Sequence, residues 1–119
     1  MGMVAHERGS YDEALEWYRK SQAILEELGD RAGTASSLSQ IGVLLTETGR
    51  PWEAVFWNLQ ALALRLELRV RQVVIDLHWL GRQREALGAE QFNEILREHL
   101  DEESTTNLLR MLDERAEQE

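Results

Sequence analysis

A stretch of 22 residues occurs twice in this chain of 119 residues. The segment GSYDEALEWYRKSQAILEELGD, residues 9–30, returns 40 positions later as GRPWEAVFWNLQALALRLELRV, residues 49–70. When residues 2–28 are placed beside residues 42–68, nine of the 27 positions are identical. The identical pairs are Gly2/Gly42, Glu7/Glu47, Gly9/Gly49, Glu13/Glu53, Ala14/Ala54, Trp17/Trp57, Ala23/Ala63, Glu27/Glu67 and Leu28/Leu68. Self-similarity at a fixed period is the signature of stacked structural repeats, so this feature decides the fold class.

Apolar residues recur at three- and four-residue steps along most of the chain, which predicts amphipathic helices. Pro51 suits the first turn of a helix, and Asp30 can cap the helix that follows it. Gly9 is expected to end a short helix, as Gly49 ends a later one, and Ser10 to cap the next. The chain is thus expected to open inside a repeat. Helices are predicted over residues 1–8, 11–28, 31–48, 51–68, from the junction at 68–72 to about 86, over 89–99, and beyond about 104.

The helix over residues 11–28 carries apolar side chains on two sides. Tyr18 and Leu25 belong to its main apolar stripe, whereas Trp17 and Ile24 form a second strip beside it. A helix that is apolar on two sides is expected to pack between two neighbours. Because Trp17 and Trp57 share one repeat position, packing between repeats is the role predicted for both, with ligand contact as the alternative.

The junction after the second copy lacks a local turn signal. The first copy ends in Gly-Asp, whereas Leu68 is followed by Arg69-Val70-Arg71-Gln72, without Gly, Pro, Asn or Asp. The repeat register predicts a turn near residues 68–72, and a continuous helix is the competing outcome. A helix joint without a breaker also favours domain swapping or dimerisation.

Charge and composition narrow the classes of partner. The chain carries 22 acidic and 13 basic residues, a net charge of −9, and no basic stripe, so nucleic acid is not expected as a partner. It has no cysteine, no apolar run long enough for a membrane span and no signal-peptide pattern, so a cytoplasmic protein that does not bind membranes is expected.

No catalytic or metal-binding pattern stands out. The three histidines, His6, His78 and His99, are not spaced as metal ligands. The serines near residue 37 lack a nucleophile elbow and a positioned base, and are better explained as small residues between close helices. We therefore expect no metal, no cofactor and no enzymatic activity.

The repeat resembles the tetratricopeptide repeat family, whose signature runs W-x2-L-G-x2-Y, A-x3-F and then A and P. Residues Leu38-x2-Ile41-Gly42-x2-Leu45 stand for its first half, and Ala54 and Ala61 supply the later alanines, whereas Asn58 and Leu66 depart from its F and P positions. The resemblance implies an all-α fold in which antiparallel helix pairs stack as a short right-handed α-solenoid with a C-terminal capping helix. The implied division is residues 1–30 for a partial first repeat, 31–69 for a second, 70–100 for a degenerate third, and 101–119 for a capping helix and polar tail.

In this family the first helix of each pair lines a concave groove that holds a peptide or helix of a partner protein. Carried over by position, the resemblance implies a groove lined by side chains from three repeats. These are His6, Ser39, Gln40, Val43, Glu47, Ile75, His78, Trp79 and Arg82.

Two other functions stay open at this point. One is self-association into a homodimer, for which the candidate residues are Trp52, Phe56, Arg69 and Val70. The other is a docking or sensor segment of a larger regulatory protein.

Overall fold

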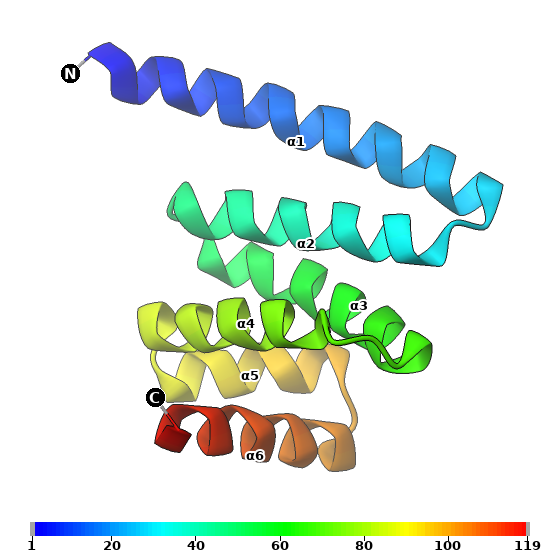
Figure 1. Ribbon diagram of the computed structural model, residues 1–119. Helices are drawn as coiled ribbons and strands as arrows, with labels where there is room; N and C mark the ends of the chain where they lie inside the picture. Colours follow the sequence, from blue (N-terminus) through cyan, green and yellow to red (C-terminus); the bar gives the residue numbers. More distant parts are fainter. Residues whose placement is uncertain (1, 119) are drawn as a thin grey trace.

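The computed structural model describes the backbone of residues 2–118 and the side chains of residues 12–118. Six helices follow one another: α1 (Gly2–Leu28), α2 (Arg31–Glu47), α3 (Pro51–Leu68), α4 (Val73–Leu87), α5 (Ala89–His99) and α6 (Glu102–Gln118) (Figure 1). Residues 2–118 contain no strand. The predicted all-α fold is therefore confirmed.

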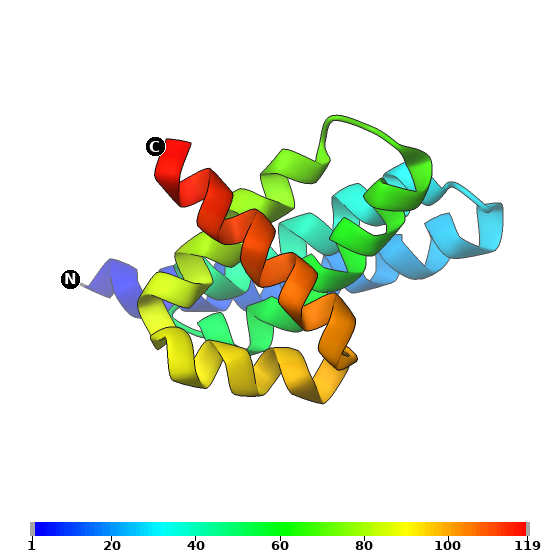
Figure 2. The ribbon, with the colours of Figure 1, turned by 90° about the horizontal axis from the view of Figure 1, so that it is seen from below.

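The helices stack as antiparallel pairs, α2 with α3 and α4 with α5. α1 lies on α2 at one end of the stack, and α6 crosses α4 and α5 at the other end, as the two views in Figures 1 and 2 show. Such a stack of helix pairs is a helical-repeat solenoid. None of the helices, within the described residues, is long and apolar enough to cross a membrane.

Two apolar clusters hold the stack together. The larger joins α3, α4, α5 and α6, and the smaller joins α1, α2 and the first half of α3. The buried members of the larger cluster are Val55, Leu59, Leu62, Leu80, Phe92, Leu96, Leu108 and Leu112, and those of the smaller are Leu15, Ile41, Leu45 and Ala54. The smaller cluster is the main apolar contact between α1 and the rest of the molecule.

Most helix ends follow the predicted signals. Asp30 caps α2 by accepting a hydrogen bond from the backbone N–H of Gly33 at 2.8 Å, and Pro51 occupies the first turn of α3. Gly29 and Gly49 adopt positive φ angles of 72° and 82° at the ends of α1 and α2. Asp101 precedes α6, where a hydrogen bond of 2.7 Å from the N–H of Ser104 lowers the pKa of its carboxyl group.

The helix end predicted at Gly9 is wrong. α1 continues through Gly9 and Ser10 as one helix of 27 residues, so Ser10 is not an N-cap. A single glycine costs a helix only about 1 kcal/mol, and no proline follows it here. Gly49, by contrast, comes two residues before Pro51, which cannot continue a helix and therefore forces the break there.

The turn predicted near residues 68–72 is confirmed, and the alternative of a continuous helix is wrong. α3 ends at Leu68, and Arg69 adopts the left-handed conformation with a φ angle of 56°. Its backbone N–H bonds to the carbonyl of Leu66 at 3.2 Å, and the N–H of Val70 bonds to that of Arg65 at 3.3 Å. An arginine has no intrinsic preference for this conformation, so tertiary contacts must hold the turn.

The packing role predicted for Trp17 is also wrong, whereas Trp57 does pack. The Trp57 side chain is half-buried against the smaller cluster, and the Arg19 guanidinium lies 5.7 Å from its ring centroid. The Trp17 side chain is 63% exposed, and Ile24 on the same strip is 57% exposed. Because α1 continues through Gly9, no helix within residues 2–118 folds back over this strip.

Candidate binding surface

Helices α2 and α4 lie side by side and run parallel, which produces the face on which most of the predicted groove residues lie. The Ser39 hydroxyl donates to the Asp76 carboxylate, and the Gln83 amide donates to the Thr46 hydroxyl at 2.9 Å. Both pairs join residues 37 positions apart, and they lie two helical turns from each other. These two bonds fix the register of α2 and α4.

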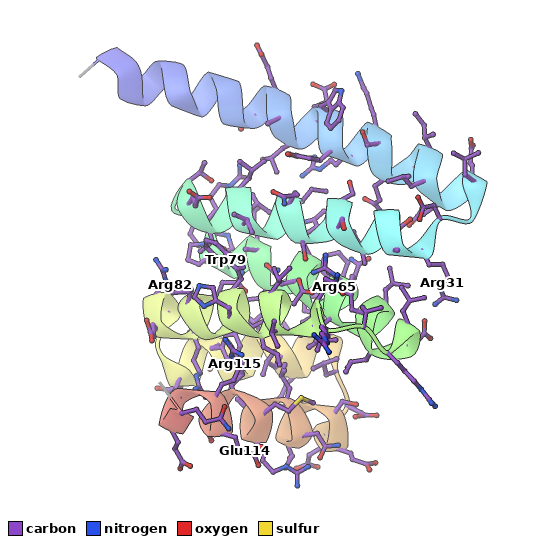
Figure 3. All side chains as sticks on the ribbon, viewed as in Figure 1. Arg31, Arg65, Trp79, Arg82, Glu114 and Arg115 are labelled. Atoms are coloured by element: carbon purple, nitrogen blue, oxygen red, sulfur yellow. The ribbon has the colours of Figure 1, made fainter. Side chains whose placement is uncertain are left out.

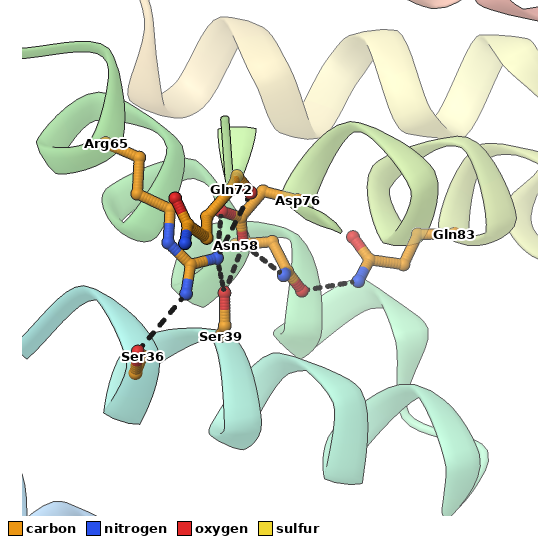
Figure 4. A network of polar contacts seen from close by, with 7 residues as sticks. All are labelled: Ser36, Ser39, Asn58, Arg65, Gln72, Asp76 and Gln83. Atoms are coloured by element: carbon orange, nitrogen blue, oxygen red, sulfur yellow. Dashed lines mark hydrogen bonds and ion pairs between the residues drawn. The ribbon is translucent and has the colours of Figure 1, made fainter. Parts of the chain in front are cut away.

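A buried polar network centred on Asp76 lies beneath this face. The Asp76 carboxylate is completely buried and pairs with the Arg65 guanidinium at 2.8 Å, while the Asn58 amide donates to it at 3.0 Å (Figure 4). Arg65 also donates to the Ser39 hydroxyl at 2.7 Å and reaches the backbone carbonyl of Gln72 at 3.5 Å. Buried charges are tolerated only when they are paired and hydrogen-bonded, as they are here.

This network explains the turn after α3. Arg65 lies on the last turns of α3, and its partners Gln72 and Asp76 lie on the far side of the turn. The guanidinium therefore ties both sides of the junction together and can hold Arg69 in its left-handed conformation. The turn therefore depends on the side chain of Arg65, four residues before Arg69, and not on a turn-forming residue at the junction itself.

Ser39 does not line the surface, which corrects its predicted place in the groove. Its side chain is only 2% exposed, because its hydroxyl is part of the network between α2, α3 and α4. The same network requires Gly42, since a Cβ atom at this position would overlap the Asn58 side chain. Ser39 and Gly42 of α2 are thus used for close packing of helices.

On α4, the exposed face carries a group of interacting side chains around Trp79. The half-buried Trp79 ring meets the exposed His78 ring edge-to-face at 5.5 Å, and the Arg82 guanidinium lies 5.7 Å from the Trp79 ring centroid. Figure 3 shows Trp79 and Arg82 at the same end of α4. A small hollow of about 70 Å³ extends from His78 and Arg82 to Arg115 of α6. An aromatic ring flanked by a cation and an imidazole offers both apolar and hydrogen-bonding contacts.

The other residues predicted for the groove have different degrees of exposure. Gln40, Glu47 and Ile75 are exposed, and Val43 is half-buried. The side chain of His6 lies outside the described residues.

A second hollow, which the sequence did not indicate, lies between α1 and α2. It has a volume of about 360 Å³ and is walled mostly by apolar surface. Its lining residues are Trp17, Tyr18, Ser21, Ile24, Leu25, Ser36, Ser37 and Gln40. The apolar strip of Trp17 and Ile24 was the available signal, but the pattern alone did not distinguish a strip that packs from one that remains open.

The four residues predicted for self-association do not form one patch. Trp52 and Phe56 are exposed one turn apart at the start of α3, where Phe56 also contacts the His99 ring at 5.0 Å. Arg69 and the half-buried Val70 follow the end of α3, and Arg69 lies about 25 Å along the helix axis from Trp52.

Within the described part of the chain, no three His, Cys, Asp or Glu residues are placed to hold a metal ion. On the stacked helices α1, α3 and α4, exposed large apolar and aromatic side chains lie among charged ones. Such a surface defines the class of helical-repeat proteins that bind other proteins.

Comparison with known families agrees with this class. A family model described as the tetratricopeptide repeat matches residues 1–67, more than half of the chain. The chain therefore belongs to the tetratricopeptide repeat family, which confirms the resemblance based on the repeated helix pair. No curated protein and no solved structure matches the chain. Repeats of this family generally mediate interactions between proteins and are a non-catalytic fold.

Proposed function

We propose that the chain binds a peptide or helix of a partner protein on the face formed by α2 and α4, without catalysing a reaction. The observation that carries this proposal is the half-buried Trp79 ring with the exposed His78 ring 5.5 Å and the exposed Arg82 guanidinium 5.7 Å from its centroid. Tryptophan and arginine are the residues most enriched among those that dominate the affinity of protein interfaces.

The rest of the face supports binding of a short segment. Gln40, Glu47 and Ile75 are exposed on α2 and α4 and offer polar and apolar contacts, and Val43 offers a partly buried apolar one. Because α2 and α4 are held in register by one buried and one part-buried hydrogen bond, the surface is formed before the partner arrives. Preorganisation of this kind lowers the entropy cost of binding.

A pull-down with the wild-type chain and the Trp79→Ala/Arg82→Ala variant tests this function. We expect a partner captured by the wild type to be lost, since removal of two central contacts weakens binding at least about 30-fold. Trp52→Ala is the matched control, because it removes an exposed tryptophan from α3 instead. Equal recovery of every partner by all three proteins would contradict the assignment.

The second candidate function is self-association through Trp52 and Phe56. Their exposure side by side on α3 favours it, since exposed aromatic pairs are typical of protein interfaces. Arg69 and Val70 would need a separate contact at the other end of α3. Sedimentation over a range of concentrations tests this candidate, and a monomer at all concentrations would reject it.

A further inference from the structure

The hollow between α1 and α2 lies at a place where the second repeat contains a helix. α2 packs along α3, and the side of α3 that carries Ala54, Trp57 and Ala61 is enclosed. Ala54 and Ala61 are completely buried, and Ala54 and the half-buried Trp57 belong to the cluster formed with α1 and α2. The equivalent residues of α1 are Ala14, Trp17 and Ser21, because the two copies align with an offset of 40. Among the described residues, no helix covers this side of α1, and Trp17 and Ser21 line the hollow instead. The internal repeat thus identifies the hollow as a seat for a helix.

The pair of α2 and α3 also shows how such a helix would pack. Ile41 and Leu45 of α2 enter the apolar cluster beside Ala54, and Gly42 lets the two helices approach closely at Asn58. The helix that fits α1 would accordingly run antiparallel to residues 12–28. It would present large aliphatic residues one turn apart with a small residue between them.

The negative charge of α1 indicates which side chains a bound helix would carry along its edge next to α1. Residues 12–30 carry six acidic and two basic side chains, a net charge of −4. On a helix of 3.6 residues per turn, Glu13, Glu16 and Glu27 fall beside the strip of Trp17 and Ile24, on the side away from α2. All three are exposed, and of them only Glu16 has an ion pair in the described part of the chain, with Lys20 at 3.7 Å. This edge favours basic side chains on whatever binds.

The same charge disfavours a second copy as the occupant. Two α1 helices packed against each other would bring together two surfaces of net charge −4, and like charges across an interface are costly. In the second repeat, moreover, the equivalent Trp57 ring has the Arg19 guanidinium 5.7 Å from its centroid. A cation over Trp17 would reproduce that contact.

We propose that the hollow between α1 and α2 binds a basic amphipathic helix of a partner protein. The helix inserts its aliphatic face between Trp17, Ile24 and Leu25 and directs lysine or arginine side chains toward Glu13, Glu16 and Glu27. This site meets the face of α2 and α4 at Gln40, which lines the hollow, but includes none of the Trp79 cluster, and its occupant extends the stack by one helix. It depends on neither Trp79 nor Arg82.

The test uses the full chain and two labelled 18-residue peptides that differ only in charge. Both carry leucines at helical spacing with one alanine between them; one has lysines along the flanking edge, and the other has glutamates there. Fluorescence anisotropy measures their binding. We expect saturable binding of the lysine peptide that weakens as salt is raised, and at least tenfold weaker binding of the glutamate peptide.

Four variants locate the binding site. Trp17→Ala and Ile24→Ala should each weaken binding of the lysine peptide at least about fivefold, whereas Trp52→Ala, an exposed tryptophan elsewhere, should leave it unchanged. Trp79→Ala should also leave it unchanged, so failure of the Trp79 face and failure of this site are seen separately. Circular dichroism confirms that each variant remains helical.

Several results would overturn the proposal. These are no binding of the lysine peptide, equal binding of both peptides, or binding that persists in Trp17→Ala and Ile24→Ala. Concentration-dependent dimerisation that these two substitutions abolish would also overturn it, because the occupant would then be a second copy.

Discussion

Residues 9–28 and 49–68 are two copies of one helical unit, but their surroundings are opposite. The second copy, α3, is enclosed between α2 and α4, with Trp57 packed and Asn58 and Arg65 in a buried polar network. The first copy, in α1, is covered on one side, and its Trp17 is 63% exposed. The comparison shows that a repeat position specifies a residue's direction on its helix. Whether that residue packs or remains available for binding depends on the neighbouring helix.

The largest effect on stability is expected from the buried network, which involves the second copy and not the first. Asp76→Ala leaves the Arg65 guanidinium buried without its partner, so we expect it to lower the free energy of unfolding by about 3–5 kcal/mol, measured in urea. Asp113→Ala removes an ion pair of the same length, with Arg84, from an exposed position and should cost less than about 1 kcal/mol. Similar small losses in both variants would mean that the network does not hold α3 against α4.

The two equivalent tryptophans offer the next contrast. Trp57→Ala should destabilise the chain by about 2–3 kcal/mol, somewhat less than for a fully buried tryptophan because this side chain is half-exposed. Trp17→Ala should change the free energy of unfolding by less than about 0.5 kcal/mol. Thermal or urea unfolding measures both, and an equal loss in the two variants would show that Trp17 packs as well.

Two glycines, Gly42 in α2 and Gly81 in α4, allow a similar comparison between a closely packed position and an open one. Gly42→Ala should cost about 1–3 kcal/mol, because the added methyl group would overlap Asn58. Gly81 of α4 follows Leu80 as Gly42 follows Ile41 in α2, but it has no atom within 4 Å of an added Cβ, so Gly81→Ala should stabilise the helix by about 0.5–1 kcal/mol. Opposite signs in urea unfolding are expected. A loss at both positions would contradict the close approach being specific to α2 and α3.

The smallest effect is expected at the turn that ends the second copy. Arg69 has a φ angle of 56°, which a glycine adopts without steric cost, so Arg69→Gly should stabilise the chain by about 0.5–1 kcal/mol. Arg71→Gly is the control, because Arg71 is not among the described residues with positive φ and should gain nothing. If Arg69→Gly were destabilising, the turn would depend on the arginine side chain.

Local signals in the sequence predicted most of the fold. Pro51 and Asp30 act within one turn of their own positions, and the helix ends that depend on them are where the pattern placed them. Gly9 was misjudged because a glycine alone is a weak breaker, and the absence of a proline after it carried the information. The identity of Gly9 and Gly49 therefore did not imply identical structure.

The candidate site was less predictable, because exposure depends on contacts between distant residues. The repeat position of Ser39 predicts a place on the surface, but its partners Arg65 and Asp76 lie 26 and 37 residues away. The identity of Trp17 with Trp57 predicts that Trp17 packs, although no helix within residues 2–118 covers it and its side chain is 63% exposed. Neither the distant partners of Ser39 nor the exposure of Trp17 can be inferred from a local sequence pattern.

Quenching of tryptophan fluorescence tests the contrast between the two copies most directly. Two variants would each keep one tryptophan, Trp17 or Trp57, with the other three replaced by phenylalanine, and be titrated with acrylamide. We predict that Trp17 is quenched nearly as efficiently as a free indole, whereas Trp57 is quenched at least about twofold less, as expected for a half-buried ring. Equal protection of the two rings would contradict the claim that the first copy presents an open face.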